Sequence, residues 1–122
     1  MSEDIHDIII IGGGPAGLTA AIYAARHNNK TIVLEGNKLG GKSLEAHWVE
    51  NYPGFPDGIS GPDLMALMEK QASKFGAEFS SETVVGIADF GEMKMLTTRK
   101  GIRQAKAVII ATGMGRKSLS VK

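Results

Sequence analysis

The residues best placed to do chemistry are six consecutive positions, 12–17, with the sequence Gly-Gly-Gly-Pro-Ala-Gly. They contain the pattern Gly-x-Gly-x-x-Gly, in which the first glycine allows a tight turn and the second lets a diphosphate approach the backbone. The third glycine lets the following helix pack closely on the preceding strand. A helix that begins here offers free N–H groups and a partial positive charge to phosphates. The segment therefore predicts a phosphate cradle.

An acidic residue, Glu35, lies 23 residues after Gly12, near the spacing of roughly 20 that is typical of dinucleotide-binding motifs. In such motifs the carboxylate accepts hydrogen bonds from the ribose hydroxyls of an adenosine. Its negative charge would repel a 2′-phosphate, which argues against NADP at this site. The alternative is a glycine-rich turn without a ligand, and the motif by itself does not separate FAD from NAD.

The segments on either side of the glycines predict a βαβ unit. A β-branched run at Asp7–Ile11 predicts a buried parallel strand, and the alanine-rich segment Pro15–His27 predicts a helix that can lie close to a sheet. A second apolar strand is expected at Lys30–Leu34, ending at Glu35. The connection between the two strands is expected to be right-handed.

A long loop and a second helix are expected next. Residues 36–60 carry several Gly and Pro turn signals, and a loop of this length in a compact domain is usually functional or mobile. Ser60 and Asp63 resemble a capping box, in which the serine caps the helix and the aspartate reaches back. The helix is expected to end at Gly76. Its apolar stripe consists of Leu64, Leu67, Met68, Ala72 and Phe75.

Short strands are predicted for the remainder of the chain. They are expected near residues 78–80, 83–87, 93–98, 102–105 and 107–111, with a hairpin turn at Arg99-Lys100-Gly101. The order of elements predicts one α/β domain.

The composition excludes several kinds of site. The chain has 122 residues, no cysteine and a formal net charge of +1. Without cysteine, no disulfide, cysteine-based zinc site or CxxC redox centre can form. The near-neutral charge gives no reason to expect nucleic acid or an anionic membrane as a partner. The scattered histidines predict no metal site, and no Ser–His–Asp or paired-carboxylate arrangement predicts a catalytic residue. No secretory signal or membrane-length apolar run is seen, so we expect a cytoplasmic protein.

Three segments of the sequence together resemble the thioredoxin reductase family of flavoproteins. They are DIIIIGGGPAGLTAAIYAAR from Asp7, VENYPGFPDGISGPDLM from Val49 and AVIIATG from Ala107. The resemblance runs from about Asp7 to Gly113, and the long loop match at 49–65 is its most specific part. It implies an α/β FAD-binding domain at residues 1–113, three-layered and Rossmann-like, with a mostly parallel sheet and a β-meander. A basic connector or tail would follow at residues 114–122.

The resemblance also implies which residues bind FAD. The cradle would hold the diphosphate, Glu35 the adenosine ribose, and Gly40–Gly41 the region of the diphosphate and ribityl chain. Asn51 would reach the flavin, Val84 would contact adenine through its backbone, and an Ala-Thr-Gly turn would pass the cofactor. The full set is Gly12, Gly13, Gly14, Pro15, Ala16, Gly17, Glu35, Gly36, Gly40, Gly41, Lys42, Asn51, Val84, Ala111, Thr112 and Gly113.

The sequence departs from that family in two ways. Lys42 stands where the family has a glutamine, and Ala46-His47-Trp48 replaces a usually threonine-rich approach to the second segment. Complete members are, by resemblance, much longer, and they carry a nicotinamide domain with a CxxC. This chain has neither feature, so it is expected to position a flavin without a second redox centre of its own.

Three functions stay open. The first is part of a flavin oxidoreductase that, in the complete family, passes electrons from NAD(P)H through FAD to a disulfide. The second is a stand-alone flavin-binding protein without turnover, or a component that needs a partner chain to supply the missing domain. The third is an NAD-binding dehydrogenase domain, which the Val49–Met65 segment disfavours. An exposed sheet edge and apolar surface are also expected to favour self-association or a partner.

Overall fold

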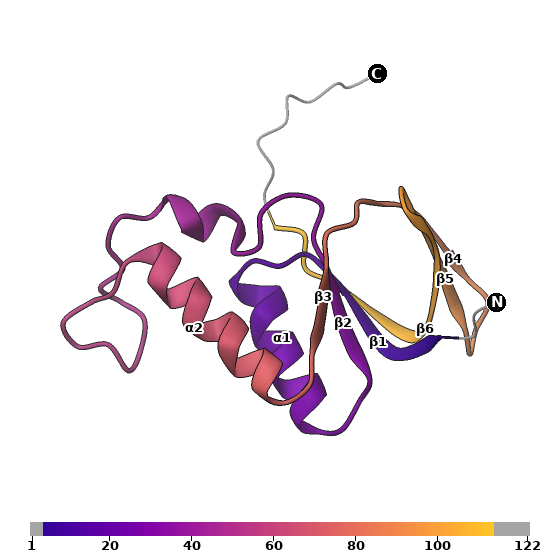
Figure 1. The fold of residues 1–122 in the computed structure, drawn as a ribbon, viewed down its shortest axis with the longest axis horizontal. Helices are drawn as coiled ribbons and strands as arrows, with labels where there is room; N and C mark the ends of the chain where they lie inside the picture. Colours follow the sequence, from indigo (N-terminus) through magenta and orange to yellow (C-terminus); the bar gives the residue numbers. More distant parts are fainter. Residues whose placement is uncertain (1–3, 114–122) are drawn as a thin grey trace, which may run out of the picture.

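The computed structural model describes residues 4–113, which form two α-helices and one six-stranded sheet (Figure 1). The helices are α1 (Pro15–Arg26) and α2 (Gly61–Lys74), and η1 (Gly41–Glu45) is a short 3-10 helix. The predicted connector at residues 114–122 lies outside the described residues. The strands are β1 (Ile5–Ile11), β2 (Thr31–Leu34), β3 (Glu78–Ser80), β4 (Val84–Asp89), β5 (Lys94–Thr98) and β6 (Gly101–Ile110).

The sheet joins a parallel half to an antiparallel half. Its strand order is β3-β2-β1-β6-β5-β4. The pairs β2–β3, β1–β2 and β1–β6 are parallel, whereas β5 pairs antiparallel with both β4 and β6. The predicted mostly parallel sheet with a β-meander is therefore confirmed.

The prediction of two separate strands at 102–105 and 107–111 is wrong. Both belong to β6, a single strand of 10 residues. Its first half pairs with β5, and its second half pairs with β1. Gln104 and Ala105 take part in both ladders, so hydrogen bonding continues without a break where the strand passes from the meander into the parallel sheet.

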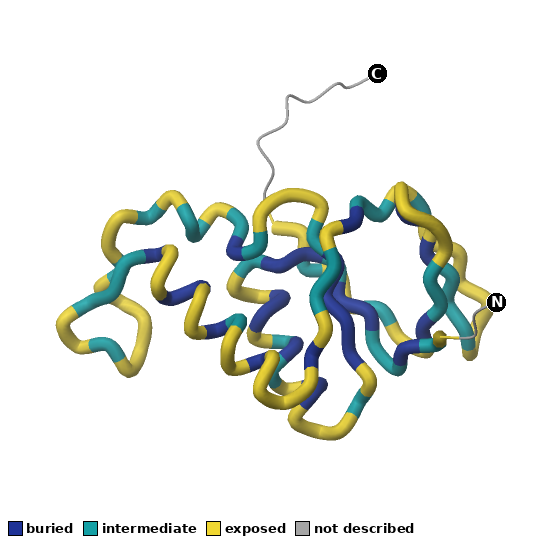
Figure 2. Tube along the Cα trace, viewed as in Figure 1, coloured by how far each residue is buried: buried dark blue, intermediate teal, exposed yellow. Residues whose placement is uncertain are grey.

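Alternate side chains of the parallel strands face two different layers. Ile10 and Val33 point toward the helices, where they pack with Ala21 and Ala25 of α1 and Ala72 of α2. Small alanine side chains let the helices lie close to the sheet. The adjacent residues of these strands point toward the meander, which is formed by β4, β5 and the first half of β6. Ile9, Ile32 and Leu34 pack there with Leu96 and Ala105 in a second cluster. The three layers are visible in Figure 1, and Figure 2 shows the buried residues along the central strands.

Both helices have the ends that the sequence predicts. Pro15 lies in the first turn of α1, and Asn28, just beyond its last turn, adopts a left-handed φ of 66°. Ser60 caps α2, because its Oγ accepts the Asp63 N–H at 3.1 Å. The structure thus shows the serine half of the predicted capping box.

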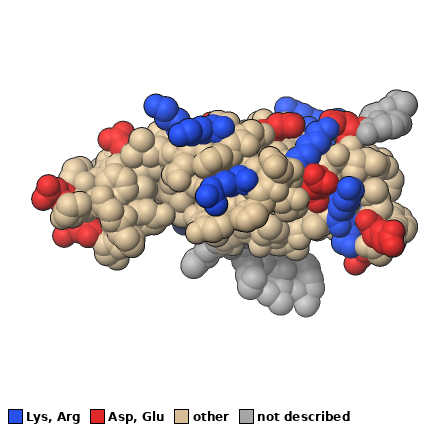
Figure 3. Space-filling model, turned by 90° about the horizontal axis from the view of Figure 1, so that it is seen from below, with Lys and Arg blue, Asp and Glu red and all other residues tan. Residues whose placement is uncertain are grey.

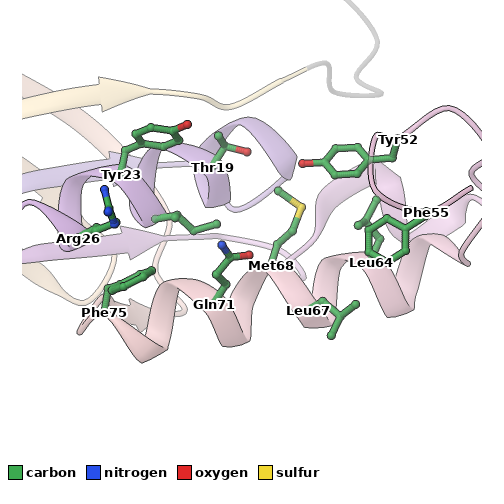
Figure 4. Close-up of a pocket in the computed structure, with 11 residues that line it drawn as sticks. Thr19, Tyr23, Arg26, Tyr52, Phe55, Leu64, Leu67, Met68, Gln71 and Phe75 are labelled. Carbon is green, nitrogen blue, oxygen red and sulfur yellow. The ribbon is translucent and has the colours of Figure 1, made fainter.

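The apolar stripe predicted on α2 is buried only in part. Leu64, Met68 and Ala72 are buried, but Leu67 is 46% exposed and Phe75 is 37% exposed. An open groove of about 450 Å³ runs between α1 and α2, and both of these exposed residues line it (Figure 4). In that view Tyr23 and Phe75 lie at one end of the groove, and Tyr52 and Phe55 lie at the other.

The stretch predicted as a long loop, residues 36–60, is folded. It contains η1 and an antiparallel bridge between Val49 and Ile59. Gly58 has a positive φ of 87°, and a Cβ at this position would lie 2.1 Å from the Trp48 Nε1. A side chain at 58 would therefore prevent the loop from closing on the indole ring.

The surface of the described residues gives two further facts. No helix within 4–113 combines the length and the apolar character that crossing a membrane requires. On the face shown in Figure 3, both basic and acidic side chains are present, and no single extended patch of Lys and Arg covers it.

Candidate cofactor-binding site

The first glycine of the cradle brings the ends of β1 and β6 together. Gly12 has a φ of 114°, and a Cβ here would lie 2.1 Å from the carbonyl oxygen of Ala111. The Ala111 N–H also donates to the Ile11 carbonyl at 2.8 Å. Because a side chain at Gly12 would clash with backbone, glycine is required. The predicted Ala-Thr-Gly turn therefore begins directly against the cradle.

The third glycine allows α1 to begin close to the same turn. A Cβ on Gly17 would lie 1.8 Å from the Gly12 carbonyl oxygen. No side chain caps the N-terminus of α1, where Gly14 is the N-cap residue and Pro15 and Ala16 follow in the first turn. The first N–H groups of the helix therefore have no side-chain partner, and together with the helix dipole they suit an anion.

Glu35 connects the cradle to the end of β2. Its Oε1 accepts the Gly13 N–H at 2.6 Å, and its Oε2 accepts the Asn37 N–H at 2.9 Å. A carboxylate oxygen can accept more than one hydrogen bond. Glu35 can therefore accept a ribose hydroxyl while its contact with the glycine loop is kept.

A second pair of glycines borders the cradle. The Gly40 N–H donates to the Gly13 carbonyl at 2.7 Å, and a Cβ on Gly41 would lie 3.4 Å from the Gly14 Cα. Gly40 and Gly41 have positive φ angles of 105° and 59°. Lys42 follows on η1 and is exposed. The structure thus brings both predicted glycines to the cradle and places Lys42 on the short helix that begins there.

A hollow of about 190 Å³ lies beside Glu35, over the ends of β2 and β3. Apart from Glu35 itself, sequence reasoning missed every residue of this hollow. The signal that could have found them is their position, because ligands bind parallel α/β sheets at the carboxyl ends of the strands. The lining residues are Glu35, Asn37, Leu39, Phe79, Ser80 and Ser81.

Thr83 links the predicted residues Gly36 and Val84, because it precedes Val84 in the sequence and lies close to Gly36. A Cβ on Gly36 would lie 2.6 Å from the Thr83 Oγ1. Val84 begins β4 and packs its side chain against the cluster on the meander face of the sheet. The side chain of Val84 is therefore used by the core, and a contact of its backbone with adenine stays a prediction.

Three predicted residues, Asn51, Thr112 and Gly113, are exposed. Thr112 and Gly113 directly follow β6. Asn51 lies in the segment Glu50–Pro56, which is exposed except at Phe55 and lines a separate hollow of about 340 Å³. The structure does not bring Asn51 into the contacts that hold the cradle together, and its role at the flavin stays a prediction.

The cradle fits the diphosphate of a dinucleotide. Gly12 and Gly17 exclude side chains where backbone groups meet, the start of α1 lacks a side-chain cap, and Glu35 is held next to both. Within residues 4–113 there is no group of three or more His, Asp or Glu side chains that could hold a metal ion.

Comparison with known proteins decides the family. Residues 6–122 match the family described as pyridine nucleotide-disulphide oxidoreductase. The chain belongs to this family. The thioredoxin reductase of Mycolicibacterium smegmatis, for example, is 47% identical over 120 residues, which are 98% of this chain and 39% of that protein. The predicted resemblance is therefore confirmed.

Solved oxidoreductases of this family share the fold. The thioredoxin reductase of Streptococcus pyogenes MGAS5005 has a TM-score of 0.89 at 42% identity, over 98% of this chain and 39% of that one. The thioredoxin reductase of Gloeobacter violaceus has a TM-score of 0.87 at 39% identity, over 94% of this chain and 37% of that one. The chain thus spans about 39% of the length of such relatives. Family membership confirms the Rossmann-like fold and supports a flavin as the cofactor.

Proposed function

We propose that this chain is the FAD-binding part of a thioredoxin-reductase-like flavin oxidoreductase. One observation carries the proposal. Gly12 lies against the Ala111 carbonyl and against Gly17 of α1, at distances that exclude a side chain on either glycine. Backbone groups alone can face a ligand there, which suits a diphosphate. The relatives that match over nearly the whole chain are thioredoxin reductases, which favours FAD over NAD.

Each predicted residue has a role in this proposal. The cradle, Gly12–Gly17, binds the diphosphate, and Glu35 orients the adenosine ribose. Gly36 lets Thr83 approach the end of β2. Gly40, Gly41 and Lys42 border the diphosphate and ribityl chain. Val84 contacts adenine, Asn51 reaches the flavin, and the turn at 111–113 passes the cofactor. FAD, when bound, supplies electron transfer between a reduced nicotinamide and a disulfide, while residues 1–113 hold and orient it.

Gly14 offers a clean test, because its surroundings differ from those of Gly12 and Gly17. A Cβ on Gly14 would meet one protein atom within 4 Å, the Gly40 carbonyl oxygen at 3.9 Å, and its φ is −82°. Gly14→Ala should therefore fold normally but place a methyl group in the path of the diphosphate. Gly86→Ala is the matched control, since its Cβ would meet one atom, Thr97 Cβ, also at 3.9 Å.

The experiment is a titration of each purified chain with FAD, followed by flavin absorbance and by calorimetry. The unaltered chain and Gly86→Ala should bind FAD with similar affinity, and Gly14→Ala should bind at least tenfold more weakly. Failure of the folded unaltered chain to bind FAD, or equal binding by all three chains, would overturn the proposal. Tight binding of NAD without FAD would support the dehydrogenase alternative.

A second candidate function is flavin binding without turnover. It is favoured by the absence of cysteine from all 122 residues, because a dithiol within the chain cannot then accept electrons from the flavin. The FAD-loaded chain should therefore show no steady oxidation of NADH or NADPH. Sustained turnover by the chain alone would contradict this candidate.

We also propose that a second protein surface covers the far half of β6. Residues 107–110 of this strand pair with β1 on one side, whereas the ladder to β5 ends at Ala105. Ile110 is 67% exposed beside this edge. A second copy of this chain, or a partner chain that carries a nicotinamide-binding domain, would bury it.

Light scattering tests this association. Ile110→Lys should lower the average mass of the chain at high concentration. Ile102→Lys is the matched control, because Ile102 is 64% exposed on the same strand but lies where β5 is paired. A monomeric unaltered chain, with no mass change when candidate partners are added, would contradict the association.

A further inference from the structure

Glu82 is a buried carboxylate in the short connection between β3 and β4. The residue is 6% exposed. Arg103 of β6 donates to both carboxylate oxygens from its Nε, at 2.9 and 3.1 Å, and also from its Nη2. The Ser80 hydroxyl donates to Oε2 at 2.7 Å, and the Thr98 hydroxyl oxygen lies 3.0 Å from Oε1. One side chain thus joins the end of β3 to both strands of the β5–β6 hairpin.

The bonding keeps Glu82 charged. Hydrogen bonds from Arg103 are the main cause that lowers the pKa of Glu82 to about 2, and they outweigh burial, which raises it. Removing one partner of a buried ion pair strongly destabilises the folded chain, because the other charge is left without compensation. Loss of Glu82 should therefore release the segment that it anchors.

That segment, Ser80–Thr83, is one wall of the hollow beside Glu35. Ser80 and Ser81 line the hollow directly. The Glu35 N–H donates to the Ser80 carbonyl at 3.1 Å, and the Arg99 N–H donates to the Thr83 carbonyl at 3.1 Å. The wall is therefore attached to the strand that carries Glu35 on one side and to the meander on the other.

The position of the hollow suits the base of an adenosine. The cradle lies at the ends of β1 and β6, and the hollow lies over β2 and β3, so the two are on opposite sides of Glu35 in the strand order. With the diphosphate in the cradle and the ribose at Glu35, we expect the base to extend toward the hollow. Leu39 and Phe79 offer it apolar contact, and the two serines offer polar contact.

We infer that Glu82 is a positioning residue for the adenosine half of the cofactor, which acts by holding the Ser80–Thr83 wall through Arg103. The inference rests on the proposed binding of FAD in the cradle. Removing Glu82 should therefore lower the affinity for every ligand that carries adenosine diphosphate by the same factor, because the flavin half is not involved.

The test is the affinity of the full chain for FAD and for ADP in the unaltered protein, Glu82→Gln and Arg103→Lys. Glu82→Gln keeps the size of the side chain but removes its charge, and should weaken FAD and ADP by a similar factor of at least tenfold. Arg103→Lys keeps the positive charge but loses the two-point geometry, so both affinities should fall by a smaller and again equal factor. It also gives a readout if Glu82→Gln does not fold.

A matched control separates positioning from a general loss of stability. Leu96 is fully buried in β5, opposite Arg103 in the β5–β6 ladder, and packs in the cluster on the meander face. Its apolar side chain takes no part in the hydrogen bonds of Glu82. Urea unfolding of Leu96→Val and Leu96→Ala identifies the variant whose stability matches that of Glu82→Gln. At a temperature where both are folded, the Leu96 variant should bind FAD and ADP like the unaltered chain.

The outcomes are distinct. Equal losses for FAD and ADP in Glu82→Gln, with normal binding by the Leu96 variant, support the inference. Equal weakening by the Leu96 variant, unchanged binding by the Glu82 variant, or a loss for FAD without a loss for ADP would overturn it while the proposed function stands. Failure of the unaltered chain to bind either ligand would overturn both.

Discussion

The cradle and the wall border the two sides of Glu35, but they are held by different forces. At the cradle, Gly12 and Gly17 bring backbone atoms to distances that no side chain allows. At the wall, Glu82 and Arg103 hold the chain by a buried ion pair. The first depends on steric exclusion between backbone atoms. The second depends on protonation state, so the two parts of one site should respond differently to mutation and to pH.

The largest effect is expected at the cradle, from Gly17→Ala. The added Cβ would lie 1.8 Å from the Gly12 carbonyl oxygen, which forces α1 away from β1. We expect a loss of at least about 3 kcal/mol in the free energy of unfolding. Urea unfolding followed by circular dichroism measures it. Gly14→Ala is the control and should change little, so similar stability of the two variants would refute the steric explanation.

The next effect is expected at the wall, as a dependence of stability on pH. The pKa of Glu82 is about 2 in the folded chain and 4.5 ordinarily, so its stabilisation is complete above about pH 4.5 and is lost as the pH falls toward 2. The loss should be on the order of 3 kcal/mol. Urea unfolding at several pH values, compared with Glu82→Gln, isolates this contribution. A stability difference between the two chains that stays constant over this range would contradict it.

A smaller effect is expected when one neutral neighbour of Glu82 is removed. Thr98 is buried, its hydroxyl lies 3.0 Å from the Glu82 carboxylate, and its Oγ1 accepts the Lys100 N–H at 3.0 Å. Thr98→Val should lower the free energy of unfolding by about 1–2 kcal/mol. Thr97→Val, at an exposed position of the same strand, is the control. Equal effects at the two positions would mean that the hydrogen bonds of Thr98 do not stabilise the wall.

The smallest effect is expected at an exposed ion pair elsewhere in the meander. The Lys94 Nζ lies 3.2 Å from the Asp89 Oδ1, and the aspartate side chain is 69% exposed. Solvent screens such pairs. Asp89→Asn should therefore leave the urea midpoint unchanged within experimental error. A midpoint shift as large as that of Glu82→Gln would show that burial is not what distinguishes the pair at the wall.

The cradle was predictable from the sequence because its physical requirements are local. Gly12, Gly14 and Gly17 lie within six positions, and a Cβ on Gly17 would lie 1.8 Å from the Gly12 carbonyl oxygen of the same short segment. The spacing to Glu35 is fixed by the length of one helix and one strand. The βαβ unit and the hairpin at Arg99-Lys100-Gly101 followed in the same way from hydrophobic runs and turn residues.

The wall was not predictable in this way. Glu82 and Arg103 are 21 residues apart and belong to no periodic pattern, so nothing in the sequence indicates that they pair. Their contact depends on how the meander packs over the sheet. The single strand β6 and the exposed flank of α2 at Leu67 were missed for the same reason, since both depend on which neighbour each residue meets in three dimensions.

Binding of FAD in the cradle is tested most directly by titrating the isotope-labelled chain with FAD and following the NMR shifts of its backbone amides. We expect the largest shifts on the cradle and the first turn of α1, at residues 12–18, with smaller shifts at 80–83. Shifts confined to other parts of the chain, or no shifts at saturating FAD, would contradict it.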